Sequence, residues 1–253
     1  MTLMAIVTLF TPTRNKPDHL REAYSSLKQQ TDPRWEWLIA LNEPDVRTIA
    51  AAREFSRSEN VRYVHHKNEA SGPRSLEGAY PPAVMINCYY PQIQTKYLMF
   101  LADDDLLEPD TLETLTGALE VNPDWDVVYG KCEKWIECES VFHKNDRCIE
   151  HGGRWWEPSG WIGGGLDIGH GTGINPDCVL DGGQILQTKR SYYKMLQDNW
   201  QLSTDRSVCG HADGIFMQRL AEFYCFHFIN KKVVTHRITA LSTMTKPDWA
   251  WLA

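Results

Sequence analysis

The chain has 253 residues, of which 42% are hydrophobic and 23% charged, and its formal net charge is -7. This composition is typical of a globular domain that can bury a sizeable core. The acidic balance and the lack of any Lys/Arg-rich block argue against a nucleic-acid partner. No apolar run is long enough to predict a transmembrane helix, and the opening MTLMAIVTLF lacks the basic start and cleavage site of a secretory signal.

The seven cysteines are scattered along the chain. An odd number of cysteines in a chain of this size favours reduced thiols over a disulfide framework. We therefore expect a cytoplasmic protein.

The first half alternates strand-like and helix-like segments. MAIVTLF at 4–10 is apolar on both faces, which is typical of a buried parallel strand. Asp18 is expected to cap a helix from His19 to about Gln30. Later strands are expected at WEWLIALN, VRYVHH, TKYLMFLA and WDVVYGKCEKW, and later helices at 45–57, at 81–90 and from Pro109 to about Glu120.

This alternation predicts an α/β fold with an open sheet that is parallel in its first half. Right-handed crossovers then place the loops after the first, second and fourth strands at one carboxyl edge, where ligands usually bind. The second half is less periodic. We expect a long loop over the sheet at 140–176, helices near 189–198 and 213–223, and one or two late strands in FHFINKKVVTHRI. The absence of repeats and low-complexity linkers predicts one domain, 1–253.

Three adjacent carboxylates, Asp103, Asp104 and Asp105, follow an apolar strand in YLMFLADDDLLEP. They could form a solvated turn that caps the next helix. A calcium loop of the EF-hand type is disfavoured, because its glycine is missing. The third interpretation is a divalent-metal site for a phosphorylated ligand, and the buried strand favours it because it fixes the carboxylates at the ligand-binding edge.

The ordered set PTRN, WEWLIALN, NVRYVHH, ASGPR, FLADDDLLEPDTLE and ADGIFMQRL resembles the family-2 glycosyltransferases of GT-A fold. Within that family the set is most similar to the spore-coat-polysaccharide-type members. The resemblance implies a Rossmann-like open sheet, with a nucleotide-sugar-binding half at 1–130 and a loop-rich acceptor half at 131–253. It also implies a nucleotide-diphosphate sugar donor, a glycan or small-molecule acceptor, Mn²⁺ or Mg²⁺, inversion at the anomeric carbon and a role in polysaccharide biosynthesis.

The same resemblance implies roles for individual residues. Asp104 matches the usual metal ligand, with Asp105 and the late His236 as further metal-site residues. Ala102 stands where the commonest family pattern has its first aspartate. The residues expected to contact the nucleotide are Thr11, Thr13, Arg14, Asn42, Arg74 and Asp103.

Inverting transfer also needs a general base within hydrogen-bond reach of the acceptor hydroxyl. Asp213, at the start of the helical segment ADGIFMQRL, matches the base position of the family. Asp181 in CVLDGGQ is a second candidate base. Either carboxylate could instead be a plain structural group, as an N-cap residue is.

Several alternatives are weighed against this interpretation. A nucleotidyltransferase or a dinucleotide dehydrogenase would need a glycine-rich loop after the first strand, and TPTRNKPD has no glycine. A non-catalytic nucleotide- or glycan-binding protein on a degenerate transferase fold remains open, because Ala102 and Asn42 depart from the family pattern. Trp155, Trp156 and Trp161 could stack on a ligand or anchor the loop that carries them. Structural zinc at Cys132, Cys138, Cys148 and His151 is disfavoured, because the chain has no CxxC pair.

Overall fold

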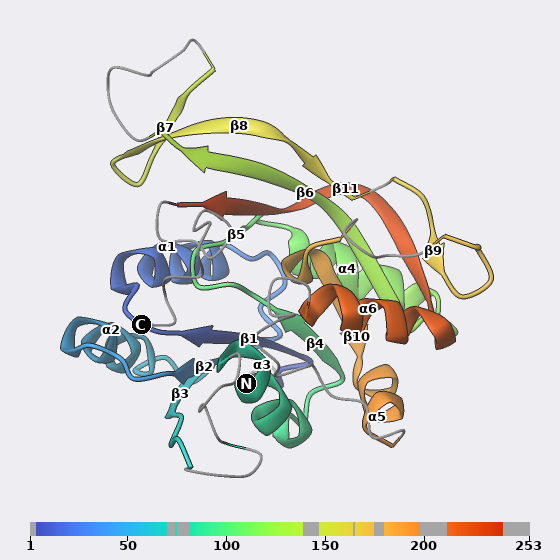
Figure 1. The fold of residues 1–253 in the computed structure, drawn as a ribbon, viewed down its shortest axis with the longest axis horizontal. Helices are drawn as coiled ribbons and strands as arrows, with labels where there is room; N and C mark the ends of the chain where they lie inside the picture. Colours follow the sequence, from blue (N-terminus) through green and yellow to red (C-terminus); the bar gives the residue numbers. More distant parts are fainter. Residues whose placement is uncertain are drawn as a thin grey trace.

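The structure is a computed structural model that describes residues 4–69, 74, 81–138, 147–163, 165–174, 180–197 and 212–239 (Figure 1). Its strands are β1 (Val7–Thr13), β2 (Trp35–Leu41), β3 (Val61–His65), β4 (Tyr97–Phe100), β5 (Leu106–Leu107), β6 (Val127–Glu137), β7 (Ile149–His151), β8 (Arg154–Ile162), β9 (Ile168–Gly169), β10 (Ile185–Thr188) and β11 (Cys225–Ile238). Its helices are α1 (Pro17–Lys28), α2 (Val46–Phe55), α3 (Pro81–Tyr89), α4 (Thr111–Val121), α5 (Lys189–Gln197) and α6 (Ala212–Phe223), with short 3₁₀ turns η1 (Tyr90–Gln92) and η3 (Gly182–Gln184).

The strands form one sheet with the path β3-β2-β1-β4-β10-β6-β11-β5. The first four strands of this path are parallel, as predicted from the alternating pattern. β10 runs antiparallel between β4 and β6, and β11 is parallel to β6. The carboxyl ends of β1, β4, β6 and β11 therefore lie on one edge of the sheet, together with the amino end of β10.

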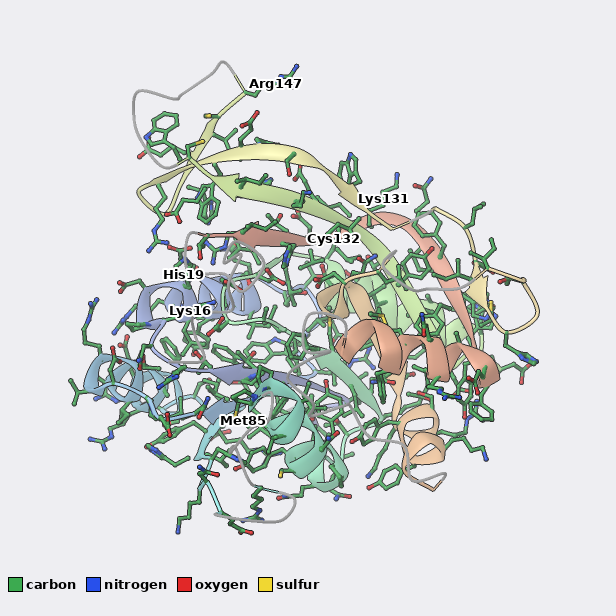
Figure 2. The ribbon with its side chains drawn as sticks, viewed as in Figure 1. Lys16, His19, Met85, Lys131, Cys132 and Arg147 are labelled. Carbon is green, nitrogen blue, oxygen red and sulfur yellow. The ribbon has the colours of Figure 1, made fainter. Side chains whose placement is uncertain are left out.

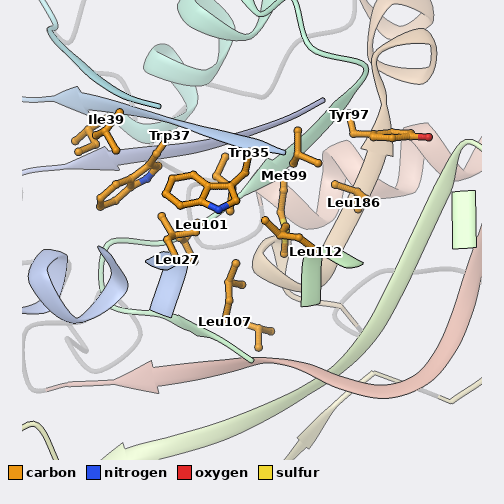
Figure 3. Packing of buried hydrophobic residues seen from close by; sticks show 14 of the residues in the cluster. Leu27, Trp35, Trp37, Ile39, Tyr97, Met99, Leu101, Leu107, Leu112 and Leu186 are labelled. Atoms are coloured by element: carbon orange, nitrogen blue, oxygen red, sulfur yellow. The ribbon is translucent and has the colours of Figure 1, made fainter. Parts of the chain in front are cut away.

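Apolar side chains cover both faces of the sheet, which makes the fold a three-layer α/β structure. On one face, α1, α2 and α4 pack against residues such as Trp37 and Ile39, and Figure 3 shows this cluster. On the other face, α3, α5 and α6 pack against residues such as Phe10 and Leu38. Neighbouring residues of β2 thus point to opposite cores, which explains why its sequence is apolar almost throughout.

The predicted loop at 140–176 is wrong for much of its length, because β7 and β8 form a hairpin that continues the sheet from β6. His151 pairs with Arg154 across a two-residue turn of Gly152 and Gly153, both at positive φ (60° and 74°). This is the turn that two-residue hairpins favour. Trp156 on β8 is fully buried, whereas Trp161 is 59% exposed, so these two tryptophans have different environments.

The predicted cap of the first helix is also wrong. Helix α1 begins at Pro17, Lys16 is its N-cap residue, and Asp18 lies within the first turn. Proline is well suited to the first helical position, because its missing N–H would have no partner there. The side chain of Asp18 pairs instead with Arg47 at 3.0 Å. This shift leaves Lys16 at the point where the chain leaves the carboxyl edge.

Candidate functional site

The three aspartates form a tight turn directly after β4. The backbone N–H of Asp105 donates to the carbonyl of Ala102 at 3.2 Å. Asp103, Asp104 and Asp105 are 8%, 6% and 0% exposed, so they are not a solvated surface turn. Buried carboxylates need charged or hydrogen-bonding partners, and the structure gives a different set of partners to each.

Lys16 pairs with the first two carboxylates. Its Nζ lies 3.0 Å from Asp103 Oδ1 and 2.7 Å from Asp104 Oδ2. Thr13 also donates its hydroxyl to Asp103 Oδ2 at 2.7 Å. Burial alone would lower the pKa of Lys16, but the attraction of the two carboxylates outweighs it and raises that pKa. Lys16 therefore stays charged and acts as an internal cation for this pair.

Lys16 lowers the pKa of both partners, but the net shifts of the two aspartates have opposite directions. Burial raises the pKa of Asp103, and the nearby lysine only partly offsets this effect. For Asp104, burial acts in the same direction, but the charge and hydrogen bond of Lys16 outweigh it, so the pKa is lowered. Asp104 is therefore the firmly ionised member of the pair.

Asp105 belongs to a separate cluster with His236 and Asp181. His236 Nδ1 lies 3.1 Å from Asp105 Oδ1 and 3.6 Å from Asp181 Oδ2. The backbone N–H of Arg237 donates to Asp105 at 3.1 Å, and that of Gly183 donates to Asp181 at 2.8 Å. Three segments far apart in sequence therefore meet at the edge: the turn after β4, the turn before β10 and the end of β11.

The two carboxylates change the titration of the histidine. Burial would lower the pKa of His236, but Asp105 and Asp181 together raise it to about 10. Burial raises the pKa of Asp181, and the histidine offsets this only in part. Without another cation, His236 thus supplies the positive charge that the two aspartates require.

The same three side chains fit a divalent cation. One ligand atom from each of Asp105, Asp181 and His236 lies within 4.8 Å of the others. Carboxylate and imidazole ligands suit Mn²⁺, and carboxylates suit Mg²⁺. Gly183 keeps the space open, since a Cβ there would lie 3.1 Å from Asp181 Oδ1 and 3.2 Å from Asp105 Oδ2. Of the predicted metal residues, Asp105 and His236 meet here with Asp181, whereas Asp104 is bonded to Lys16.

Arg237 holds this arrangement together and was not anticipated from the sequence. It is fully buried, its Nε donates to the carbonyl of Asp104, and its guanidinium pairs with Glu22 on α1. The guanidinium also lies 5.3 Å from the ring centroid of Trp156. Arg237 thus joins the acidic turn, α1 and the β8 hairpin.

Lys16 was also missed, because its partners are about ninety residues away in the chain. Figure 2 shows Lys16 and His19 at the amino-terminal end of α1, near the end of β11. His19 in turn contacts Arg154 of β8, with 2.6 Å between His19 Nε2 and the guanidinium nitrogen. The hairpin, α1 and the acidic turn therefore pack around one buried charged region.

The predicted nucleotide residues lie on neighbouring strands but differ in what they offer a ligand. Thr11 is buried, donates to the carbonyl of Leu101 at 2.7 Å and accepts from the Trp37 indole at 2.8 Å. Its hydroxyl has no exposed surface, so Thr13 is the better placed of the two predicted threonines. The buried Asn42 Oδ1 has no hydrogen-bond partner among the described residues. An unpaired buried carbonyl is costly, and a donor on a ligand would remove that cost.

The two predicted arginines are both exposed. Arg14 pairs with Glu43 at 3.0 Å, and Glu43 is the one non-glycine residue with positive φ in the described parts of the chain. Arg74 lies 3.7 Å from Glu69. Both arginines follow parallel strands at the carboxyl edge of the sheet, where the nucleotide contacts are predicted.

Asp213 lies in the first turn of α6, and its side chain is outside the described part of the structure. Only Tyr224 separates α6 from β11, and the last turn of α6 lies beside Gly169 of β9, next to the start of β11. The helix therefore runs back along β11, so its first turn points towards the carboxyl edge (Figure 1). The base role of Asp213 stays a prediction.

The family profile described as "Glycosyl transferase family 2" matches residues 8–178. Protein CgeD from Bacillus subtilis (strain 168) is 25% identical over 237 residues, which cover 90% of this chain and 49% of CgeD. The chain thus spans about half the length of this curated relative.

Solved structures share the fold at low sequence identity. S. aureus TarS 1-349 in complex with UDP-GlcNAc has a TM-score of 0.63 and 13% identity, covering 92% of this chain and 58% of that one. The TarS complex with UDP has a TM-score of 0.62 and 12% identity, covering 92% and 61%. The mannosyltransferase PcManGT from Pyrobaculum calidifontis, in complex with GDP-Man and Mn²⁺, has a TM-score of 0.57 and 15% identity, covering 99% and 60%. In the described residues of this chain, no helix has the length and hydropathy to cross a bilayer.

Proposed function

Because this chain belongs to glycosyl transferase family 2 and has the GT-A fold, we propose that it transfers a sugar from a nucleotide-diphosphate donor to an acceptor hydroxyl, with inversion at the anomeric carbon. The main support is the convergence of Asp105, Asp181 and His236 beside the Asp103–Asp104 pair, at the edge where α/β sheets bind ligands. Burying charged groups costs free energy, so a domain with a purely structural role is not expected to bury so many ionisable groups at one edge.

The donor nucleotide binds across the ends of β1 and β2 in this proposal. Asn42 offers its buried carbonyl to a donor group on the base. Thr13 and Lys16 hold Asp103 in place, so its carboxylate can accept from a ribose hydroxyl. The related structures were solved with UDP, UDP-GlcNAc and GDP-Man, so the fold is compatible with either a pyrimidine or a purine donor.

Asp105, Asp181 and His236 would hold Mn²⁺ or Mg²⁺, with Asp104 next to them. The cation would supply positive charge that stabilises the diphosphate leaving group. The family resemblance assigns the metal to Asp104, whereas the geometry favours Asp105 with His236. A residue must be deprotonated to bind a metal ion. If His236 is a ligand, it must therefore lose the proton that gives it its positive charge.

Asp213 is the proposed base. As the acceptor oxygen forms its bond to the anomeric carbon, its proton passes to the Asp213 carboxylate. The bond from the anomeric carbon to the phosphate oxygen breaks on the opposite side, and its electron pair leaves with the nucleoside diphosphate. This single displacement inverts the anomeric configuration. Asp181 is the second candidate base, although burial raises its pKa, so that less of it is ionised and ready to accept a proton when no cation is bound.

A second candidate function is favoured by one observation. Lys16 already occupies the position between Asp103 and Asp104 that a cation would take. Together with Ala102 in place of the first aspartate, this favours a non-catalytic nucleotide- or glycan-binding protein. Slow hydrolysis of a nucleotide sugar in the absence of acceptor separates the two functions, because only an enzyme would release free sugar.

Donor binding is expected to raise the melting temperature in a metal-dependent way. In a panel of UDP- and GDP-sugars with Mn²⁺, one donor at a hundred times its Kd should stabilise the fold by about 2.7 kcal/mol. For a chain of this size that corresponds to a shift of roughly 5 to 10 °C. EDTA should remove most of the shift, and His236→Ala should lose its metal-dependent part. Equal shifts with and without Mn²⁺ would rule out the metal role while leaving nucleotide binding intact.

A further inference from the structure

A second group of metal-ligating side chains lies at the opposite end of β11. Asp167, Cys225 and His227 each offer one ligand atom, and these atoms lie within 4.8 Å of one another. Along β11, His227 is nine residues before His236, which is about 30 Å of extended strand. The group is therefore separate from the proposed catalytic edge.

The local sequence and the strand register explain why these three side chains meet. Cys225 and His227 are two residues apart on one strand, so they share a face of the sheet. β9 pairs antiparallel with the start of β11, with Ile168 opposite Phe226. The preceding residue, Asp167, then lies opposite His227, on the same face as that histidine. The strand register thus brings the three residues to one place on one face of the sheet.

Two further contacts hold the ligands in position. The ring of His227 stacks on Trp125, with 3.8 Å between ring centroids and 10° between planes. The other carboxylate oxygen of Asp167 accepts from the backbone N–H of Phe228 at 2.7 Å. Contacts of this kind orient ligands in metal sites, because the donor atoms are then held without further ordering.

The distances fit a small tetrahedral ion. Ligand atoms at zinc bond lengths lie roughly 3.3 to 3.8 Å from one another. His227 Nδ1 and Asp167 Oδ2 are 3.1 Å apart, and Cys225 Sγ lies within 4.8 Å of both ligand atoms. We propose that Asp167, Cys225 and His227 bind Zn²⁺, with water in the fourth position, and that the ion fastens β9 to β11.

The chemistry of the donors separates this site from the catalytic one. A thiolate, an imidazole and a carboxylate select Zn²⁺, whereas the carboxylate-rich set at the carboxyl edge suits Mn²⁺ or Mg²⁺. Burial and the neighbouring Asp167 raise the pKa of the Cys225 thiol, so the free thiol is protonated at neutral pH. A bound dication reverses this, because a coordinating thiol is deprotonated outright.

Cobalt titration of the full chain tests the proposal, because Co²⁺ substitutes for Zn²⁺ and a cobalt–thiolate bond absorbs in the near ultraviolet. The wild type should show this absorption at one equivalent of Co²⁺, and one equivalent of Zn²⁺ should abolish it. Cys225→Ser should lose the absorption. Asp167→Asn, at a half-exposed position that tolerates the change, should bind Co²⁺ at least about tenfold more weakly.

Other thiols provide matched controls. Cys132 is buried near the carboxylate cluster, and Cys138 lies 3.0 Å from Cys148, measured between sulfur atoms. Cys132→Ser and Cys138→Ser should both keep the cobalt–thiolate absorption. Absence of the absorption in the wild type, or its loss in one of these controls but not in Cys225→Ser, would overturn the proposal.

Discussion

The Asp213→Asn variant is expected to keep donor binding and to lose sugar transfer by about a hundredfold to ten-thousandfold in kcat. General-base catalysis contributes a factor of this size, and an amide of the same shape cannot accept the acceptor proton. The measurement is steady-state transfer to a working acceptor, with donor affinity followed in parallel by melting temperature.

Glu222→Gln is the matched control for this variant. It makes the same acid-to-amide change in the same helix, but Glu222 is exposed in the last turn and pairs with Arg219 at 2.9 Å. Its kcat should stay within about twofold of wild type, as expected for a surface charge. Near-normal transfer by Asp213→Asn would contradict the proposal and place the base elsewhere.

Replacing Arg237 by methionine is expected to lower the free energy of unfolding by about 3 kcal/mol. Removing one member of a buried ion pair leaves the other charge uncompensated, which usually costs about 3 to 5 kcal/mol. The lower end applies because Glu22 keeps partial access to solvent. The carbonyl of Asp104 also loses its donor, so the acidic turn should loosen and Mn²⁺-dependent donor binding should weaken.

Arg47→Met provides the comparison for urea unfolding of this variant. Arg47 pairs with Asp18 at 3.0 Å, but both side chains are more than half exposed. Such a pair contributes about 0 to 1 kcal/mol. If Arg237→Met were no more destabilised than Arg47→Met, Arg237 would not be the residue that joins α1, the acidic turn and the hairpin.

The first half of the fold could be predicted because its strands are buried on both faces and its helices have clear apolar stripes. β2 and β4 lie within the expected segments, whereas β1 begins three residues later than expected and continues to Thr13. Errors at helix ends come from competing capping residues. At α1, the proline preference for the first turn outweighs the capping tendency of Asp18. In this half, the local sequence was sufficient to predict the strands, because each one is buried in a parallel sheet and is therefore apolar.

The β7–β8 hairpin was missed for a specific physical reason. Gly and Pro residues in RWWEPSGWI interrupt the alternation that usually indicates a strand. Gly152 and Gly153 were nevertheless a usable signal, since two adjacent glycines between β-forming residues favour a hairpin turn. Giving weight to that turn would have predicted both strands.

The sequence selected the members of the candidate site one by one, but it did not predict how they group in the fold. Asp105, Asp181 and His236 were each selected from the sequence, yet their contact depends on β10 running antiparallel between β4 and β6. Lys16 and Arg237 were missed because each pairs with carboxylates far away in the chain. Ion pairs between residues far apart in the chain leave no local sequence pattern, so they can be identified only in the folded structure.

The anomeric configuration of the released sugar tests the proposed function most directly. The full chain is incubated with Mn²⁺ and the donor that gives the largest thermal shift, and the first product is followed by proton NMR before it equilibrates. Inverting chemistry predicts a Mn²⁺-dependent reaction whose first sugar product has the anomeric configuration opposite to that of the donor. A product with retained configuration, or no sugar release from a donor that binds tightly, would contradict the proposal.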